Sequence, residues 1–440
     1  MRMCIAILIC RVLHFCGSIV GGFSSLPGKL ALKICPDVLK KVKLCENIIA
    51  VTGSNGKTST TELIATTLKK SGVDAVYNKE GSNQIEGVTT LILSNCDFKG
   101  NFKPQALVIE SDERYARLTF RYFTPKYFLI TNLLRDQLTR NRHPEWIFDI
   151  IARCISPNSK LILNADDPIV ASFGIKFENA IYYTVDKTVI SSPKTMLSYN
   201  DGAFCPNCKM PLQYEYKNYG ALGRFKCTNC SNGSANSQFA ITNVNVEAKT
   251  IEINSKFQIQ TDNLDIHNMY NLLAAFVTCS CCGVKQSKVA QALSNHKSQT
   301  GRILNFIFDG SAAELLISKH ENSMSYNCSI AHVLNQNEDV SVLIVVDRIS
   351  RKYFTSETSW LWDIDFEELN TDRVKSIILG GKYCYDLLVR FNSTEIPKEK
   401  IFCEPDFQLL KNTVKTHKQG KLFVLTCLAD QERVIKELTN

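Results

Sequence analysis

The residues with the clearest chemical purpose form a short loop, Gly53-Ser54-Asn55-Gly56, followed directly by Lys57 and Thr58. Residues 48–51 before the loop are an apolar run typical of a buried strand, and residues 58–70 after it have the apolar spacing of a helix. Glycines let a backbone approach a phosphate closely, and a helix N-terminus offers N–H groups and partial positive charge to an anion. In such a loop Lys57 would neutralise the β- and γ-phosphates, and the Thr58 hydroxyl would bind Mg²⁺. A chance Gly-Lys-Thr in an ordinary strand–turn–helix is the alternative. The pattern predicts a nucleotide-phosphate site made by Gly53, Asn55, Gly56, Lys57, Thr58 and Ser59.

Acidic side chains follow a second apolar run, residues 106–109, at the point where a strand would end. In open α/β sheets, ligands bind at the carboxyl ends of the strands, and a carboxylate there is suited to the metal ion of a bound nucleotide. We therefore predict that Glu110 binds Mg²⁺ together with Thr58, and that Glu110 and Lys57 are catalytic. A solvated acidic turn is the alternative interpretation of this segment.

Three further apolar runs, at residues 127–130, 161–163 and 181–185, alternate with segments of helical character. The first two of these runs are followed by polar or acidic residues. This alternation is typical of a parallel sheet with helices on its faces. The sequence therefore predicts an α/β domain with a parallel-rich sheet and a nucleotide across its carboxyl-terminal edge. Alternating apolar residues between 238 and 264 predict the strands that close this domain.

Two Cys-x-x-Cys pairs, Cys205/Cys208 and Cys227/Cys230, interrupt the α/β pattern. Each pair can form a thiolate knuckle, and two knuckles make a closed tetrahedral site for Zn²⁺. Since four cysteines leave no coordination position open, the zinc would be structural. Redox or disulfide use of the cysteines is the alternative. We predict a Cys4 zinc ribbon at about residues 203–232, inserted in the nucleotide-binding domain.

The rest of the chain predicts a second, smaller α/β domain. Apolar runs at residues 313–318, 340–346, 374–379 and 421–425 are expected as strands, and residues 329–336, 383–391 and 406–416 as helices. The predicted organisation is a helical N-terminal segment at 1–45, the nucleotide-binding domain at 46–300 and the second domain at 301–440.

The overall composition narrows the class of protein and its compartment. An apolar content of 45% and a charged content of 21% exclude a wholly disordered chain. The net charge of +8 fits polyanionic ligands and does not by itself indicate nucleic acid. The 18 cysteines lie mostly in apolar runs, which is typical of reduced thiols. We therefore expect a cytoplasmic protein, and the apolar residues 1–20 add contact with the inner face of a membrane as a further expectation.

Four segments, taken in order, resemble the Mur ligase family. They are residues 52–58 (Thr-Gly-Ser-Asn-Gly-Lys-Thr), 131–132 (Thr-Asn), 164–168 (Asn-Ala-Asp-Asp-Pro) and 267–271 (His-Asn-Met-Tyr-Asn). The resemblance implies a Mur ligase-type P-loop ATPase domain that uses ATP and Mg²⁺ to phosphorylate a carboxylate. It also implies that further residues bind the nucleotide: Asn164, Asp166, Asp167, Asn268, Asn271 and Arg302.

The inserted Cys-x-x-Cys pairs, Arg135-Asp136-Gln137-Leu138 and the segment 360–366 are similar to one branch of that family. The resemblance to this branch implies amidation of the α-carboxylate of D-glutamate in the lipid II stem peptide, which yields D-isoglutamine for peptidoglycan. A GatD-like class I glutaminase, bound to this chain as a heterodimer, would supply the ammonia that attacks an acyl phosphate. The substrate, lipid II, would lie at the membrane surface. In this branch an aspartate is thought to complete the partner's catalytic triad, and the matching residue here is Glu357.

Several positions of the second domain depart from the branch, including Glu357 itself and residues 347–352. Two other functions therefore remain open beside the amidating ligase. One is a carboxylate–amine ligase that uses free ammonia or an amino acid. The other is a non-catalytic protein that binds nucleotide for assembly, although Lys57, Thr58 and Glu110 are all retained.

Overall fold

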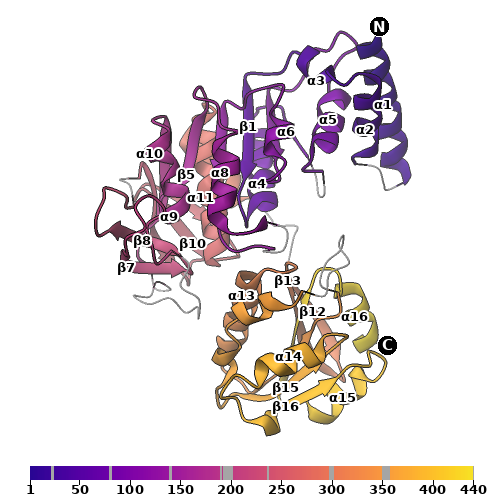
Figure 1. Cartoon of the computed structure of the whole chain (residues 1–440), viewed down its shortest axis with the longest axis vertical. Helices are drawn as coiled ribbons and strands as arrows, with labels where there is room; N and C mark the ends of the chain where they lie inside the picture. Colours follow the sequence, from indigo (N-terminus) through magenta and orange to yellow (C-terminus); the bar gives the residue numbers. More distant parts are fainter. Residues whose placement is uncertain are drawn as a thin grey trace. The chain divides into compact units, whose positions relative to one another are not determined.

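The computed structural model describes residues 1–20, 24–78, 82–137, 141–188, 191, 202–234, 237–296, 302–348 and 357–439. The chain divides into two compact units. The first comprises residues 1–134, 143–195 and 200–297, and the second comprises residues 135–142, 196–199 and 298–440 (Figure 1).

The first unit is built on a sheet whose strand order is β11-β10-β9-β6-β5-β4-β1-β3-β2. All neighbouring strands between β2 and β9 in this order pair in parallel, and β10 pairs antiparallel with both of its neighbours, β9 and β11. Their bounds are β1 Asn47–Thr52, β2 Ala75–Tyr77, β3 Ala106–Glu110, β4 Tyr127–Ile130, β5 Lys160–Asn164, β6 Ala180–Val185, β9 Phe239–Asn245, β10 Thr250–Ile253 and β11 Phe257–Gln260. Because helices cover both faces, the central strands are continuous apolar runs, as the sequence predicted.

Ile48 and Ala50 are two residues apart in β1, so both point to the same face of the sheet, where they pack in two different core clusters. Ile48 packs in one core cluster with α1 (Arg2–Val20), α2 (Leu26–Ile34) and α5 (Ile85–Ser94), and Ala50 packs in another with α8 (Pro144–Ala152). On the opposite face, α4 and α11 pack against each other and against the sheet. The remaining helices of this unit are α3 Val38–Lys41, α4 Lys57–Lys70, α6 Ala116–Thr119, α9 Pro168–Ala171, α10 Phe173–Lys176, α11 Ile266–Cys281 and α12 Gln286–Ser294.

A two-stranded hairpin, β7 (Leu212–Tyr219) and β8 (Leu222–Cys227), projects from the chain between β6 and β9. It carries the second cysteine pair at its end, and it is the inserted segment that the sequence predicted.

The second unit is a three-layer α/β sandwich with strand order β12-β13-β17-β14-β15-β16. All its strands are parallel except β12, which pairs antiparallel with β13. One face is covered by α13, α14 and the 3₁₀ turns η1 and η2, and the other by α15 and α16. The bounds are β12 Ile303–Phe308, β13 Ser311–Ser318, α13 Ser323–Leu334, β14 Val340–Val345, η1 Ser359–Asp363, η2 Phe366–Leu369, β15 Val374–Gly380, α14 Cys384–Phe391, η3 Lys398–Lys400, β16 Ile401–Glu404, α15 Leu410–His417, β17 Lys421–Cys427 and α16 Gln431–Thr439.

Two details of the second unit differ from the sequence prediction. The helix expected at 329–336 is α13, which begins six residues earlier because the Asn322 side chain caps it by accepting a hydrogen bond from Ser325 N at 2.8 Å. The edge strands β12 and β16 were not predicted. Figure 1 shows the fold of each unit with these labels.

Among the described residues, one helical stretch, Arg2–Ile19, is long and apolar enough to cross a membrane. Signal sequences and core helices pass the same test of length and composition.

Candidate functional site

The loop between β1 and α4 has the backbone of a phosphate-binding loop. Gly53 has φ +132° and Gly56 has φ +81°, which are left-handed conformations that favour glycine. A side chain would not fit at either position, because a Cβ on Gly53 would collide with Thr131 Oγ1 and one on Gly56 with Asn271 Oδ1. The turn into the N-terminus of α4 is therefore formed as predicted, with Thr58 exposed on the first turn of the helix.

The end of β4, which lies beside β1, fixes the loop. Thr131 Oγ1 donates to Asn55 O at 2.8 Å, and Asn132 Nδ2 donates to the same oxygen at 3.1 Å. Asn55 N in turn donates to Asn132 Oδ1 at 2.9 Å. Sequence reasoning placed Thr131 and Asn132 in a motif but did not select them as site residues. The sequence feature that could have identified them is a pair of polar residues directly after a buried strand.

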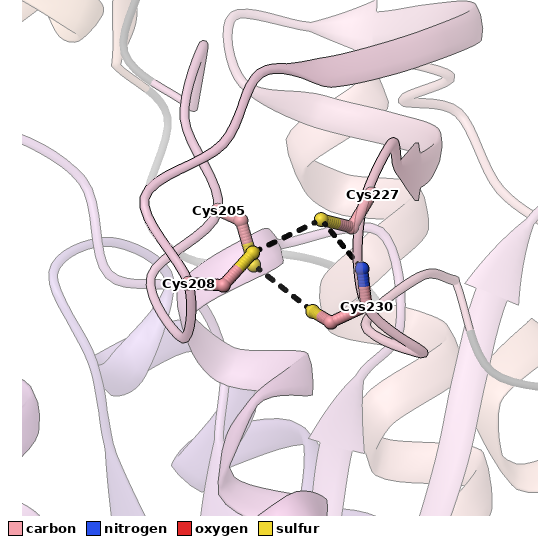
Figure 2. A group of neighbouring side chains, drawn as sticks. All are labelled: Cys205, Cys208, Cys227 and Cys230. Atoms are coloured by element: carbon pink, nitrogen blue, oxygen red, sulfur yellow. Dashed lines mark hydrogen bonds between the residues drawn. The ribbon is translucent and has the colours of Figure 1, made fainter.

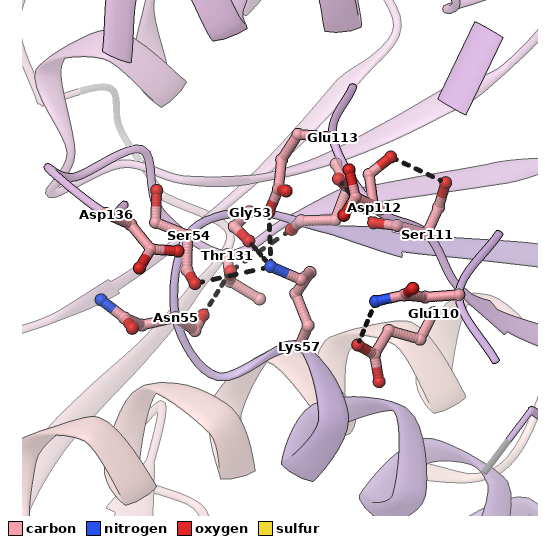
Figure 3. A network of polar contacts seen from close by, with 12 residues as sticks. Gly53, Ser54, Asn55, Lys57, Glu110, Ser111, Asp112, Glu113, Thr131 and Asp136 are labelled. Atoms are coloured by element: carbon pink, nitrogen blue, oxygen red, sulfur yellow. Dashed lines mark hydrogen bonds and ion pairs between the residues drawn. The ribbon is translucent and has the colours of Figure 1, made fainter. Parts of the chain in front are cut away.

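Lys57 directs its ammonium group back into the loop (Figure 3). It contacts Gly53 O and forms an ion pair with Glu113, and the two side chains are only 11% and 5% exposed. Glu113 is thus a site residue that the prediction did not choose among the acidic residues after β3. A phosphate in the loop would bring oxygens to the same ammonium group.

Glu110 ends β3 opposite Val51 of β1. Its backbone is held by the Asn78 side chain: Glu110 N donates to Asn78 Oδ1 at 2.7 Å, and Asn78 Nδ2 donates to Glu110 O at 2.9 Å. Asn83 Nδ2 donates to the Glu110 carboxylate at 3.4 Å. The carboxylate therefore lies at the sheet edge that also carries the loop, and Mg²⁺ binding by Glu110 and Thr58 stays a prediction.

The two asparagines expected from α11 have different surroundings. Asn271 lies against the phosphate loop, where its Oδ1 accepts a hydrogen bond from Thr60 Oγ1 at 3.1 Å and packs against Gly56. Asn268 instead donates to Asn263 O at 2.7 Å in the segment before the helix. The structure thus brings Asn271, but not Asn268, to the loop.

The two carboxylates that follow β5, Asp166 and Asp167, are buried in the protein. Asp166 accepts hydrogen bonds from Thr184 Oγ1, Val185 N and Tyr270 OH at 2.5 to 2.8 Å, and Asp167 caps α9. Burial raises the pKa of each carboxyl to about 6. Asn164 Nδ2 donates to Thr131 O at 3.0 Å, behind the phosphate loop. Direct contact of Asn164, Asp166 and Asp167 with a nucleotide stays a prediction. Their hydrogen bonds in the structure hold neighbouring segments of the protein in place.

The four cysteines of the two pairs converge on one point (Figure 2). Their sulfur atoms all lie within 4.8 Å of one another, and Asn229 N and Cys230 N both donate to Cys227 Sγ at 3.4 Å. These backbone hydrogen bonds lower the pKa of the Cys227 thiol to about 6. Four such sulfurs are the donor set of a structural zinc site, so the residues fit Zn²⁺.

The hairpin next to this cluster packs against the Asp166 region. Asn218 Nδ2 donates to Val185 O at 2.8 Å and to Tyr270 OH at 3.1 Å, and Gly223 N donates to Asp166 O at 2.9 Å. The cysteine cluster therefore lies next to a hairpin that is hydrogen-bonded to Val185 at the end of β6 and to Asp166 after β5.

We expect the protein to bind about one Zn²⁺ and the Cys227→Ser variant to lose it, because a missing thiolate opens a four-ligand site. Metal analysis of the purified chains would measure this, and hydrogen exchange of residues 212–227 should rise in the variant. Cys154→Ser is the matched control, since its thiol lies outside the cluster. A Cys227→Ser protein with unchanged metal content and exchange would contradict a zinc site.

The second unit contains its own polar cluster. Asp136 forms an ion pair with Lys319 and accepts a hydrogen bond from Asn322 Nδ2 at 2.9 Å, while Gln137 N donates to Glu321 O at 3.0 Å. The structure thus joins Asp136 and Gln137 to the start of α13. Leu138 of the same predicted motif lies outside the described residues.

Arg302 and Glu357 also belong to the second unit. Arg302 Nη1 donates to Ser325 Oγ at 3.0 Å, and its predicted contact with nucleotide stays a prediction. Glu357 is exposed, and its carboxylate accepts a hydrogen bond from Ser359 N at 2.7 Å, which lowers its pKa. Of the two tryptophans nearby, Trp360 is buried in the core and Trp362 is exposed.

Comparisons with known proteins agree with this fold and loop. The Mur ligase middle domain matches residues 51–202, and the MurT ligase C-terminal domain matches residues 319–429. Among solved structures, a pseudomurein peptide ligase type C from Methanothermus fervidus has a TM-score of 0.68 at 18% identity, covering 91% of this chain and 81% of that one. MurF ligase from Thermotoga maritima in complex with ADP has a TM-score of 0.56 at 15% identity, covering 94% and 83%. The chain therefore has the Mur ligase fold, and it matches a Mur ligase middle domain and a MurT ligase C-terminal domain.

The relatives that match most of its length include MurT subunits. The lipid II isoglutaminyl synthase (glutamine-hydrolyzing) subunit MurT of Staphylococcus aureus strain N315 is 29% identical, over 89% of this chain and 87% of the relative. The subunit of the same name from Streptococcus pneumoniae strain R6 is 27% identical, over 97% and 94%.

Proposed function

We propose that this chain is the synthetase subunit of a lipid II isoglutaminyl synthase, and that it amidates the α-carboxylate of D-glutamate in lipid II. The observation that carries the proposal is the glycine loop with Lys57 held inside it, in a chain that is similar to MurT subunits over most of its length. A fold alone would not support one substrate, since one fold hosts many activities.

The proposed reaction has two steps. A carboxylate oxygen of D-glutamate attacks the γ-phosphorus of ATP, ADP leaves, and an acyl phosphate forms. The nitrogen of ammonia then attacks the acyl carbon, phosphate leaves with the former carboxylate oxygen, and loss of a proton gives the amide.

The chain's own residues have defined tasks in this reaction. Lys57 and the N-terminus of α4 stabilise charge on the phosphates, and Thr131 and Asn132 hold the loop in shape. Bound Mg²⁺ would supply further positive charge on the phosphate oxygens, with Thr58 and Glu110 as its proposed ligands.

We further propose that a GatD-like class I glutaminase supplies the ammonia and that the two subunits form a heterodimer. The relatives are named as subunits of a glutamine-hydrolysing enzyme, which supports a partner of this kind. Glu357 would then be the carboxylate that orients a histidine of the partner. Its exposure and lowered pKa suit this role, because an ionised carboxylate holds an imidazolium best.

The test is ATP turnover with lipid II, run with ammonium and then with glutamine plus a candidate glutaminase. Amidated lipid II from both nitrogen sources is expected. Product from ammonium alone would support the ligase and reject the coupling. Absence of both product and ADP would reject the ligase and favour a nucleotide-dependent binding protein, and transfer of an amino acid would indicate the other class of ligase.

Two variants separate the coupling from the ligase step. Glu357→Gln should reduce the glutamine-driven reaction and leave the ammonium-driven reaction unchanged, because the residue acts only on the partner. Glu399→Gln, at another exposed glutamate of the same unit, is the matched control and should leave both reactions unchanged.

A further inference from the structure

Helix α1 carries an exposed row of large apolar side chains along its length. Their spacing of three and four residues places them on one face of a helix, and each is between 41% and 71% exposed. We call this row the outer stripe, and its members are Ile5, Leu8, Val12, Phe15 and Ile19. At 1.5 Å per residue it is about 21 Å long.

The opposite face of α1 is buried in the first unit. Ala6, Ile7 and Cys10 are fully buried in a core cluster with residues of α2 and α5. Figure 1 shows α1 beside these helices at the outer end of the unit. The outer stripe is therefore not part of the core, and packing within the unit does not explain why these positions are apolar. Contiguous apolar surface of this kind marks a contact with another molecule or a membrane.

The surroundings of the stripe are basic. Residues 1–45 contain seven lysines and arginines and one acidic residue, Asp37. All seven basic side chains are exposed, including Arg2 and Arg11 on α1 and Lys29 and Lys33 on α2. Arg11 also lies over the ring of Phe98, an exposed aromatic residue beside α1, at 5.2 Å from its centroid. The segment thus holds most of the chain's net charge of +8.

We propose that the outer stripe docks on the surface of an anionic lipid bilayer, with α1 lying in the plane of the interface. Apolar side chains flanked by arginine and lysine are the composition of an interfacial helix. A membrane-spanning α1 would need lipid around its whole circumference, whereas one face of α1 is packed in the protein core. A second copy of this chain would bring two strongly basic surfaces together, which disfavours a dimer through the stripe.

This proposal goes beyond the proposed function and does not depend on it. Vesicle binding requires neither ATP nor amidation, so either idea can fail alone.

The experiment measures co-sedimentation of the full chain with vesicles of phosphatidylcholine and phosphatidylglycerol, and with vesicles of phosphatidylcholine alone. We expect binding to the anionic vesicles that weakens as salt is added. The double variant Leu8→Glu/Phe15→Glu should bind at least about tenfold more weakly, because both substitutions place charge in the apolar row. Lys29→Gln/Lys33→Gln should also bind about tenfold more weakly and show a smaller salt dependence.

The matched control is Ile175→Glu/Val246→Glu, which alters two exposed apolar residues of the same unit outside α1 and should bind as the unaltered chain does. Thermal unfolding of each variant checks that it is folded. The proposal is overturned if the unaltered chain does not bind anionic vesicles, or if the stripe variant binds equally well. Self-association that the stripe variant abolishes, without vesicle binding, would identify a second copy as the occupant and overturn it too.

Discussion

Lys57→Ala is expected to lower ATP-dependent amidation by about a hundredfold to a thousandfold, since removal of one preorganised charge-stabilising donor has an effect of this size. Lys57 is the cation that the glycine loop encloses, where it contacts Gly53 O and forms an ion pair with Glu113. The loss should be equal with ammonium and with glutamine, because phosphoryl transfer precedes the use of either. Release of ADP and formation of amidated lipid II would measure it.

The Lys57→Ala experiment needs a control for folding. Removing the lysine leaves the buried Glu113 carboxylate without its cation, which destabilises by on the order of 3 kcal/mol. The double variant Lys57→Ala/Glu113→Gln removes that buried charge and should recover stability without recovering activity. Lys69→Ala, an exposed lysine in the last turn of the same helix, should behave as the unaltered chain. More than about a tenth of the activity in the folded double variant would place the phosphate site elsewhere.

The parts of the site that could be predicted from the sequence are those set by local geometry. Gly53 and Gly56 are required by the backbone of one tight turn, and the cysteine pairs close a site through their own spacing. Such features are encoded in a few residues at fixed spacing, so the sequence predicts them directly.

The parts that could not be predicted depend on which strands are neighbours. Glu110 and Glu113 follow the same strand, and only the folded end of β3 determines that Glu113 meets Lys57. Nucleotide contact by Asp166 stays a prediction, whereas its hydrogen bonds to Thr184 and Tyr270 depend on the pairing of β5 with β6 and on the position of α11. The strand β12 was missed because most of its residues are apolar, at both its exposed and its less exposed positions, so the sequence shows no regular alternation of polar and apolar residues.

Asp167→Ala is expected to destabilise the first unit by on the order of 3 to 5 kcal/mol, because three backbone donors lose a buried acceptor. Asp167 Oδ1 accepts from Ile169 N at 2.9 Å and from Val170 N at 3.1 Å at the start of α9. Its Oδ2 accepts from Leu133 N at 2.7 Å, and the side chain is buried. One carboxylate therefore ties the cap of a helix to the segment that follows β4.

The connection through Leu133 links stability to the phosphate loop. Leu133 follows Asn132, whose side chain binds Asn55, so loosening this segment should also raise the KM for ATP. Asp167→Asn should be intermediate, because its amide oxygen can still cap α9 while its NH₂ group cannot accept from Leu133 N. Urea denaturation gives the stability, and hydrogen exchange of residues 129–134 and 164–171 locates the change.

The exposed Asp149 of α8 gives the matched control, and Asp149→Ala should change stability by less than about 0.5 kcal/mol. If Asp167→Ala unfolded at the same urea concentration as this control, the three donors would have found other partners, and the carboxylate would not be the element that joins α9 to the loop. The expected order, with Asp167→Asn between the unaltered chain and Asp167→Ala, tests the two oxygens separately. If Asp167 only caps α9, Asp167→Asn should be as stable as the unaltered chain. If Asp167 also holds Leu133, Asp167→Asn should be less stable, and its hydrogen exchange should rise only in the segment beside the phosphate loop.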